Sequence, residues 1–147
     1  MSDTFPYVEH KVRVRFAETD AQGVVYYANY LVWFEVARME WMRAHGISWQ
    51  ALGELNRQLI VAHAELDYRA SARYDDELRL RVFVQRVGNK SLTFGYEIYR
   101  LPDETLLTTG NTVLVCVTMA GEPMPVPDIM REPLVRDLAA REALSIS

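Results

Sequence analysis

The chain contains few of the residues that build disulfides, metal sites or membrane-spanning helices. It has one cysteine, Cys116, which excludes an internal disulfide. Cys116 lies in the apolar run 111–119 and is predicted to be a buried, unreactive thiol. The histidines His10, His45 and His63 do not repeat the spacing of metal ligands, so no metal site is expected. No apolar run approaches the ~20 residues that cross a bilayer, which predicts a cytoplasmic protein without membrane insertion.

An excess of positive charge is absent as well. The 16 Lys and Arg residues are outnumbered by 20 Asp and Glu residues, and the net charge is −4. This mild acidity argues against a nucleic-acid partner, which usually requires a basic stripe, but it leaves room for a local basic pocket for a phosphorylated ligand. Because no repeat or Pro/Gly/Ser-rich linker divides the chain, residues 1–147 are predicted to form a single domain.

The first half of the chain reads as strand, loop and long helix. Residues 7–16 alternate as a strand does, with Val12, Val14 and Phe16 on one face. Residues 18–25 are expected to form a loop. Residues 28–45 then change to a helical period, with Asn29 as a possible cap and Gly46 after the last turn. The face of this helix that is predicted to enter the core carries Tyr30, Trp33, Phe34, Ala37 and Trp41. A short helix is expected over residues 48–55.

The second half is predicted to be mostly strands. They span residues 59–69, 77–87, 91–100 and 106–119, and the near-continuous apolar character of the last one suggests a central strand. A terminal helix is expected over 131–144. Tight turns between the strands imply antiparallel neighbours, and one long helix on one antiparallel sheet gives an α+β fold. A single helix cannot cover a large sheet, so we expect self-association.

Asp20 is the carboxylate whose position suggests chemistry, because it lies between the first strand and the start of the long helix. The first N–H groups of a helix have no intrahelical partner, and the helix dipole there favours negative charge. A carbonyl at that end would be polarised by a backbone N–H while Asp20 attacked it or activated water, as acyl transfer requires. The alternative interpretation is an ordinary turn or cap role for Asp20.

Three segments carry a family resemblance. Residues 13–31, RVRFAETDAQGVVYYANYL, followed by Phe34-Glu35 and Ala37-Arg38, resemble the signature of the 4-hydroxybenzoyl-CoA thioesterase family, in particular the branch associated with the bacterial Tol–Pal gene cluster. The resemblance extends through DYRASARYDDEL at 67–78 and GNKSLTF at 88–94 to the strand at 113–117. It covers roughly residues 8–125.

The resemblance implies a hotdog fold, in which a five-stranded antiparallel sheet wraps a long central helix. It also implies a homodimer that pairs its sheets, with active sites at the dimer interface, and dimers that often pair again into tetramers. The implied substrate is an acyl-CoA, which is hydrolysed to acid and CoA without a metal or redox cofactor.

The family's functional positions fall on specific residues of this chain. The catalytic aspartate corresponds to Asp20, and the backbone donor to the thioester carbonyl corresponds to the N–H of Tyr27. Gly23 matches the glycine that shapes the loop, and Asn29 matches a position close to the site. Many members of the Tol–Pal branch have histidine where this chain has Tyr27, so the preferred acyl group is expected to differ.

Further candidates have equally good structural explanations. Glu35 corresponds to a position that contacts the acyl group in some relatives, but it also suits a helix surface. Arg69, Lys90 and Ser91 are candidates for CoA contact, since Lys and Arg bind phosphate, although each also suits a surface turn. The adjacent carboxylates at 75–76 are assigned to a turn.

Two other functions are considered. A hotdog hydratase or dehydratase acting on an enoyl thioester would need a histidine beside the carboxylate, and only a strand residue such as His63 could supply it. A non-catalytic acyl-CoA or acyl-carrier binding protein would leave the thioester intact.

Overall fold

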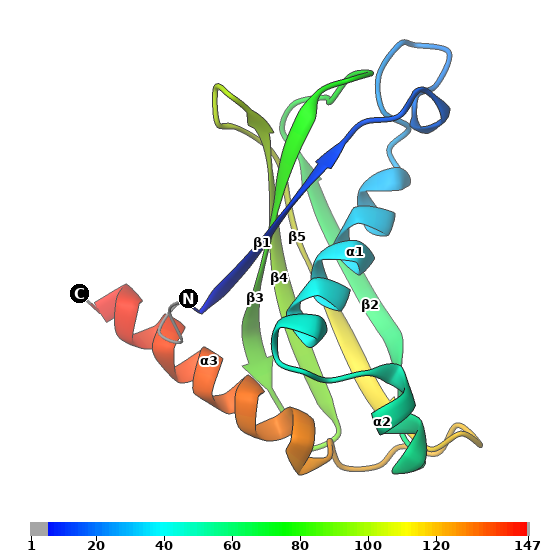
Figure 1. Ribbon diagram of the computed structural model, residues 1–147, viewed down its shortest axis with the longest axis vertical. Helices are drawn as coiled ribbons and strands as arrows, with labels where there is room; N and C mark the ends of the chain where they lie inside the picture. The colour runs from blue at the N-terminus through cyan, green and yellow to red at the C-terminus, as the bar shows by residue number, and fades with distance from the viewer. Residues whose placement is uncertain (1–5, 147) are drawn as a thin grey trace.

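The structure, a computed structural model, describes residues 6–146 (Figure 1). The strands form one antiparallel sheet in the order β1-β3-β4-β5-β2. The α+β prediction is therefore confirmed. The elements in chain order are β1 (Tyr7–Arg13), a 3-10 turn (Phe16–Glu18), α1 (Asn29–Ala44), α2 (Trp49–Glu54), β2 (Gln58–Tyr68), β3 (Glu77–Val87), β4 (Ser91–Leu101), β5 (Thr105–Val117) and α3 (Asp128–Ile146).

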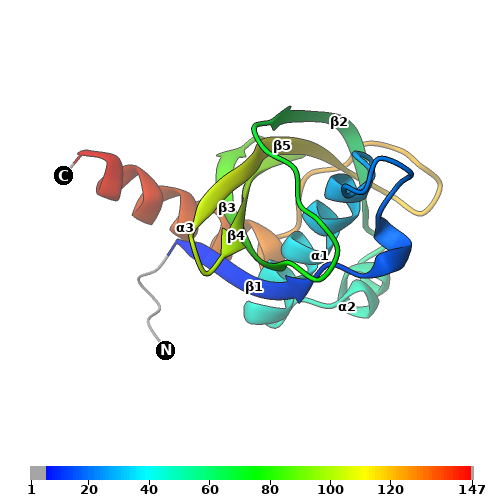
Figure 2. The ribbon, with the colours of Figure 1, turned by 90° about the horizontal axis from the view of Figure 1, so that it is seen from above.

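Helix α1 lies in the curve of the sheet, as Figure 2 shows from above. All five residues predicted for its core face are buried, which confirms the helical period. Phe34 stacks on Tyr96 of β4 with ring centroids 4.2 Å apart. Gly110 of β5 makes this close packing possible, because an added Cβ there would lie 2.7 Å from the Phe34 ring. The sheet thus wraps a long helix, as the hotdog fold requires.

Several predicted details are wrong. Strand β1 ends at Arg13, because the chain turns where the Glu18 carboxylate accepts the Arg15 N–H at 2.7 Å. Phe16 is consequently 76% exposed and does not share a strand face with Val14. Asn29 is the first residue of α1 and not its cap, which is Ala28.

β5 is an interior strand between β4 and β2, as its apolar character predicted, and the middle strand of the sheet is β4. One further boundary differs from expectation. Helix α3 begins at Asp128 and not at 131, and Pro133 lies within it. Within residues 6–146, none of the helices has the length and apolarity that crossing a membrane requires.

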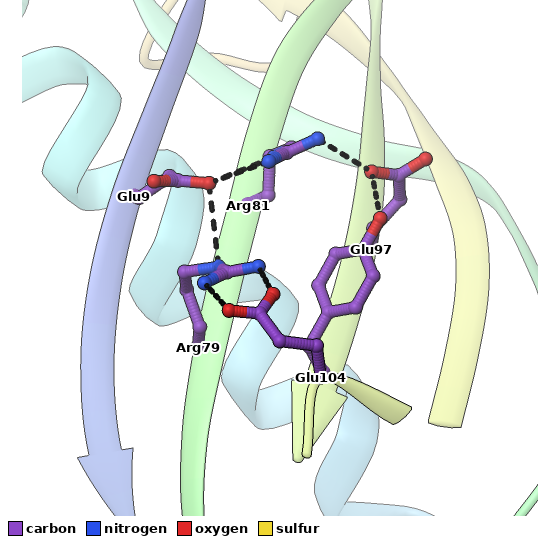
Figure 3. A network of polar contacts seen from close by, with 6 residues as sticks. Glu9, Arg79, Arg81, Glu97 and Glu104 are labelled. Carbon is purple, nitrogen blue, oxygen red and sulfur yellow. Dashed lines mark hydrogen bonds and ion pairs between the residues drawn. The ribbon is translucent and has the colours of Figure 1, made fainter. Parts of the chain in front are cut away.

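The outer face of the sheet carries a network of charges across β1, β3 and β4 (Figure 3). Glu9 contacts Arg81 at 2.8 Å and Arg79 at 3.4 Å. Arg81 also pairs with Glu97 at 3.4 Å, and Arg79 pairs with Glu104. Each guanidinium therefore has two carboxylate partners, and the network ties the edge strand β1 to its neighbours.

Candidate active site

The loop between β1 and α1 is closed by its own backbone. The Asp20 N–H donates to the Val24 carbonyl at 2.9 Å, and the Gly23 N–H donates to the Asp20 carbonyl at 3.0 Å. Gly23 has a φ of +81°, in the left-handed region that glycine adopts without strain. The predicted loop-shaping role of Gly23 therefore has a clear physical basis.

Asp20 combines a turn role with a free oxygen. Its Oδ1 accepts the Gln22 N–H at 2.8 Å, which is a turn interaction of the kind that Asp commonly makes. Among the described residues, none donates a hydrogen bond to Oδ2. The carboxylate is half-buried and lines a hollow of about 490 Å³ whose wall includes Phe16, Gly23 and Tyr74. A ligand in this hollow can therefore contact Asp20.

The start of α1 is attached to the Asp20 segment through one carbonyl group. The Glu18 carbonyl accepts the Tyr26 N–H at 2.9 Å and the Asn29 side-chain amide at 2.8 Å. The side-chain hydrogen bond with Tyr27 is the main reason that the pKa of Tyr26 is raised, and the negative charge of Asp20 adds to the rise. Asn29 thus ties the helix start to a carbonyl two residues before Asp20, and does not cap the helix.

The N–H groups of Tyr27 and Ala28 have no acceptor within residues 6–146. They are the unpaired donors at the positive end of α1, where the dipole favours a negative oxygen. The Tyr27 carbonyl is held from the other side by the Tyr68 hydroxyl of β2, which donates to it at 3.0 Å. Tyr68 also meets the rings of Tyr27 and Tyr30 edge-on, at centroid distances of 6.4 and 5.3 Å. The backbone of Tyr27 is therefore held through its carbonyl, although its ring is 62% exposed.

The structure thus brings Asp20, Gly23, Tyr27 and Asn29 together. The other candidates lie elsewhere in the protomer. Glu35 is further along α1 and exposed, and it lies 4.0 Å from Arg38. Arg69 is exposed just after the end of β2.

Lys90 and Ser91 lie at the far end of the sheet from Asp20. Asp20 follows the end of β1 that pairs with Glu77, whereas Lys90 follows the opposite end of β3 (Figure 1). The 11 residues of β3 separate these ends by about 33 Å at ~3.3 Å per residue. Within one protomer Lys90 and Ser91 therefore cannot reach a substrate carbonyl at Asp20.

The described residues include no cluster of metal ligands and no reactive thiol. Across residues 6–146, no group of three His, Cys, Asp or Glu side chains converges to hold a metal ion. Cys116 is buried, and burial raises the pKa of its thiol, which suits the predicted unreactive role. His63 is exposed and pairs with Glu65 at 3.5 Å. It lies five residues from Tyr68 along β2, about 17 Å at ~3.4 Å per residue, and so does not approach Asp20 within a protomer.

Two residues that matter to the site were not singled out from the sequence. Tyr68 ends β2, and its contact with Tyr27 joins residues 41 positions apart. Arg38 sits on α1 beside a second cavity, between α1, α2 and β2. The sequence pointed to Tyr68 and Arg38 only because both lie in segments that resemble the thioesterase family.

Comparison with known proteins identifies the family of this chain. A family described as the thioesterase-like superfamily matches residues 14–134. The acyl-CoA thioester hydrolase YbgC of Escherichia coli O6:H1 is 38% identical over 106 residues, which cover 72% of this chain and 78% of that protein. The acyl-CoA thioesterase YbgC of Haemophilus influenzae is 37% identical over 117 residues, covering 78% and 83% respectively. A solved DHNA-CoA thioesterase from Staphylococcus aureus superposes with a TM-score of 0.81 at 27% identity, covering 95% of this chain and 93% of that one. These matches confirm the family resemblance, and the chain belongs to the thioesterase-like superfamily.

Proposed function

We propose that this protein hydrolyses an acyl-CoA thioester to a free acid and CoA at the site formed by Asp20 and the start of α1. The observation that carries the proposal is a pair of unpaired groups in the segment that the Glu18 carbonyl links to the start of α1. One is the free Oδ2 of Asp20, and the other is the Tyr27 N–H, which has no acceptor among the described residues. The names of the YbgC relatives support the same reaction.

In the proposed mechanism the thioester carbonyl oxygen accepts a hydrogen bond from the Tyr27 N–H. Asp20 either removes a proton from the water that attacks the carbonyl carbon, or attacks that carbon itself and forms an anhydride, which water then hydrolyses to the free acid and the restored carboxylate. In either route the C–S bond breaks, and the electron pair leaves with the CoA sulfur, which takes up a proton. A preorganised oxyanion donor typically lowers the activation barrier by ~2.7–4 kcal/mol. The start of α1 should therefore contribute about as much to the rate as the Asp20 carboxylate does.

The proposed active form is a homodimer that pairs through β2. This strand is at the edge of the sheet, and its Ile60 and Val61 are 46% and 44% exposed. Leu31 and Val32 of α1 are also exposed, at 40% and 51%. An apolar edge strand with free N–H and C=O groups is a surface that another strand covers readily. Sedimentation velocity separates a monomer, this dimer and the dimer of dimers that the family resemblance implies.

The reaction is tested by mixing the protein with a panel of acyl-CoA thioesters and measuring free thiol. We expect thiol release from at least one short or aromatic acyl-CoA. Loss of enoyl absorbance without thiol release would instead indicate a hydratase. A bound thioester that stays intact for hours would indicate a binding protein and would overturn the proposal.

A further inference from the structure

A second cavity, of about 310 Å³, lies between α1 and β2, beside α2 and away from Asp20 in the same protomer. Its volume is at the lower end of the range of small-molecule pockets. Most of its wall is apolar, and two charged residues of α1, Glu35 and Arg38, complete it. The apolar wall residues are Met42, Trp49, Leu59, Ile60, Val61, Phe94 and Leu114.

Arg38 is the unusual member of this wall. Its side chain is only 13% exposed, yet the nearest carboxylate oxygen, from Glu35, is 4.0 Å away. Glu35 is itself 63% exposed, so it is a weak, solvated partner. On its inner side Arg38 adjoins Tyr96: burial raises the pKa of that hydroxyl, and both the charge of Arg38 and a hydrogen bond from its side chain oppose the rise. Tyr96 thus takes one donor of the guanidinium, and no described carboxylate engages the remaining donors closely.

The outer-face arginines show how other partly buried guanidinium groups of this protein are paired with carboxylates. Arg79 and Arg81 each contact two carboxylates, and the Arg81 Nε donates to Glu9 at 2.8 Å (Figure 3). Arg38 is more buried than either, with side-chain exposures of 13%, 18% and 28% respectively. A buried charge is stable only when it is paired. Arg38 thus has both the need and the free donors for an anionic ligand group.

We propose that this cavity receives the acyl group of the substrate, and that Arg38 binds a carboxylate at the far end of that group. The apolar wall suits a chain of methylenes, and the planar guanidinium suits a carboxylate, which it can bind through two parallel hydrogen bonds. The substrate class is then the CoA monothioester of a short dicarboxylic acid. This inference rests on the proposed hydrolysis and names its substrate class.

The acyl group reaches the cavity from the partner's catalytic loop. Within one protomer Arg38 lies eleven positions after Tyr27, which directly precedes the cap of α1, and the helical rise of ~1.5 Å per residue puts them about 16 Å apart. A five-carbon diacid chain spans only about 5 Å, given C–C bonds of ~1.5 Å. If two β2 strands pair antiparallel about their midpoint at His63, the partner's Tyr68 lies opposite Gln58, beside the cavity residues Leu59 and Ile60. The partner's Tyr27 backbone, which Tyr68 contacts through its carbonyl, is then within reach of a short acyl group.

The test compares glutaryl-CoA with pentanoyl-CoA, which have the same chain length and differ in the terminal carboxylate. We expect a kcat/KM ratio of about 10- to 100-fold in favour of glutaryl-CoA, the size of a charge-assisted hydrogen bond. Arg38→Met should reduce this ratio to about one, and Arg38→Lys should keep part of it. Arg43→Met is the matched control, because Arg43 is on the same helix but its side chain is 71% exposed, and it should keep the full ratio. Glu35→Gln should raise the ratio, since it removes the competing carboxylate.

Binding separates this inference from the proposed hydrolysis. Calorimetry with the Asp20→Asn variant measures the affinity of both intact thioesters without turnover, and we expect glutaryl-CoA to bind about tenfold or more tightly. Equal affinities for the two thioesters would overturn the role of Arg38, even if the wild-type protein releases thiol. So would an equal loss of affinity for both thioesters in Asp20→Asn/Arg38→Met. Tighter binding of glutaryl-CoA with no thiol release by the wild type would uphold the cavity and overturn the hydrolysis. Arg38→Met counts only if its melting curve shows a folded protein; otherwise Arg38→Lys and Glu35→Gln decide.

Discussion

The two ends of helix α1 are built in opposite ways. At its start, the Tyr27 N–H has no acceptor among the described residues, and the neighbouring Asp20 keeps a free oxygen. At its end, Asp137 of α3 accepts a hydrogen bond from the Trp41 indole at 2.9 Å and pairs with His45 at 3.1 Å. The other ring nitrogen of His45 lies 2.8 Å from the Trp41 carbonyl. The start of α1 therefore has unpaired polar groups that a ligand can reach. At the end of α1, the buried indole, imidazole and carboxylate are all paired with one another.

This difference indicates that the start of α1 serves function and the end of α1 serves stability. The Asp137 carboxylate is 6% exposed, and a charge so buried must be paired for the protein to fold. The Tyr27 N–H and the Asp20 Oδ2 have no partner among the described residues, so they contribute little to folding and remain available for a substrate. We therefore expect substitutions at the start to change activity and substitutions at the end to change stability.

The largest expected effect is on activity, from Asp20→Asn. It should lower kcat by roughly 10²–10⁴-fold, the usual contribution of a catalytic acid or base. The amide still accepts the Gln22 N–H through its oxygen, so the free energy of unfolding should change by less than about 0.5 kcal/mol. Thiol release and urea denaturation measure the two quantities. Asp75→Asn is the matched control, an exposed turn carboxylate whose loss should leave kcat unchanged. Wild-type kcat in Asp20→Asn would refute the mechanism.

The next effect is on stability, from Asp137→Asn at the other end of the helix. This variant loses the charge that pairs with His45 and weakens the bond from the Trp41 indole. Because the carboxylate is buried, the free energy of unfolding should fall by about 2–3 kcal/mol. Urea denaturation measures the change, and kcat of the folded protein should stay at the wild-type value. A large loss of kcat with unchanged stability would reverse the comparison between the two ends.

A smaller effect is expected from Tyr68→Phe, which removes the hydroxyl that holds the Tyr27 carbonyl. One neutral hydrogen bond contributes about 0.5–1.5 kcal/mol, so kcat should fall about 2- to 12-fold while KM changes little. Steady-state kinetics separate the two parameters. Tyr99→Phe is the control, because it removes a hydroxyl that donates to Glu97 on the outer face, where no effect on kcat is expected. Equal losses of kcat in both variants would show that Tyr68 does not position Tyr27.

Periodicity predicted the parts of the fold that repeat along the chain. The helical period of 28–45 identified the buried face of α1, including Phe34 and Trp41. The alternation of 77–87 identified the face of β3 that packs inward, with Leu78 and Val84 fully buried. Such patterns are local, so a sequence displays them directly. The role of Asn29 was missed for the opposite reason, since its partner is the Glu18 carbonyl eleven residues earlier.

The candidate site was predictable only where the family signature is continuous. Asp20, Gly23 and Tyr27 lie within one stretch, and the structure brings them together. The contact of Tyr68 with Tyr27 depends on the register of β2 against β5 and on the path of the loop, which no local pattern encodes. Arg38 could not be distinguished from a surface arginine, because its place in a cavity with residues of α2 and β2 depends on tertiary structure that no local pattern encodes.

The smallest effect is the pH dependence of the closed end. Burial by itself lowers the pKa of His45, but the hydrogen bonds to Asp137 and the Trp41 carbonyl outweigh it, so the pKa is raised above its ordinary 6.5. Both ring nitrogens face acceptors, so the protonated ring is the form that satisfies them. The resulting stabilisation is fully present below pH ~6.5 and is lost as the pH rises through the folded pKa. A tenfold gain in the proton affinity of the ring on folding corresponds to ~1.36 kcal/mol of stability, which sets the scale of the loss.

Urea denaturation from pH 6 to pH 9 should show this decline in the free energy of unfolding in the wild type and a smaller decline in His45→Gln. Parallel curves for the two proteins would mean that the ion pair with Asp137 does not hold α3 against the end of α1.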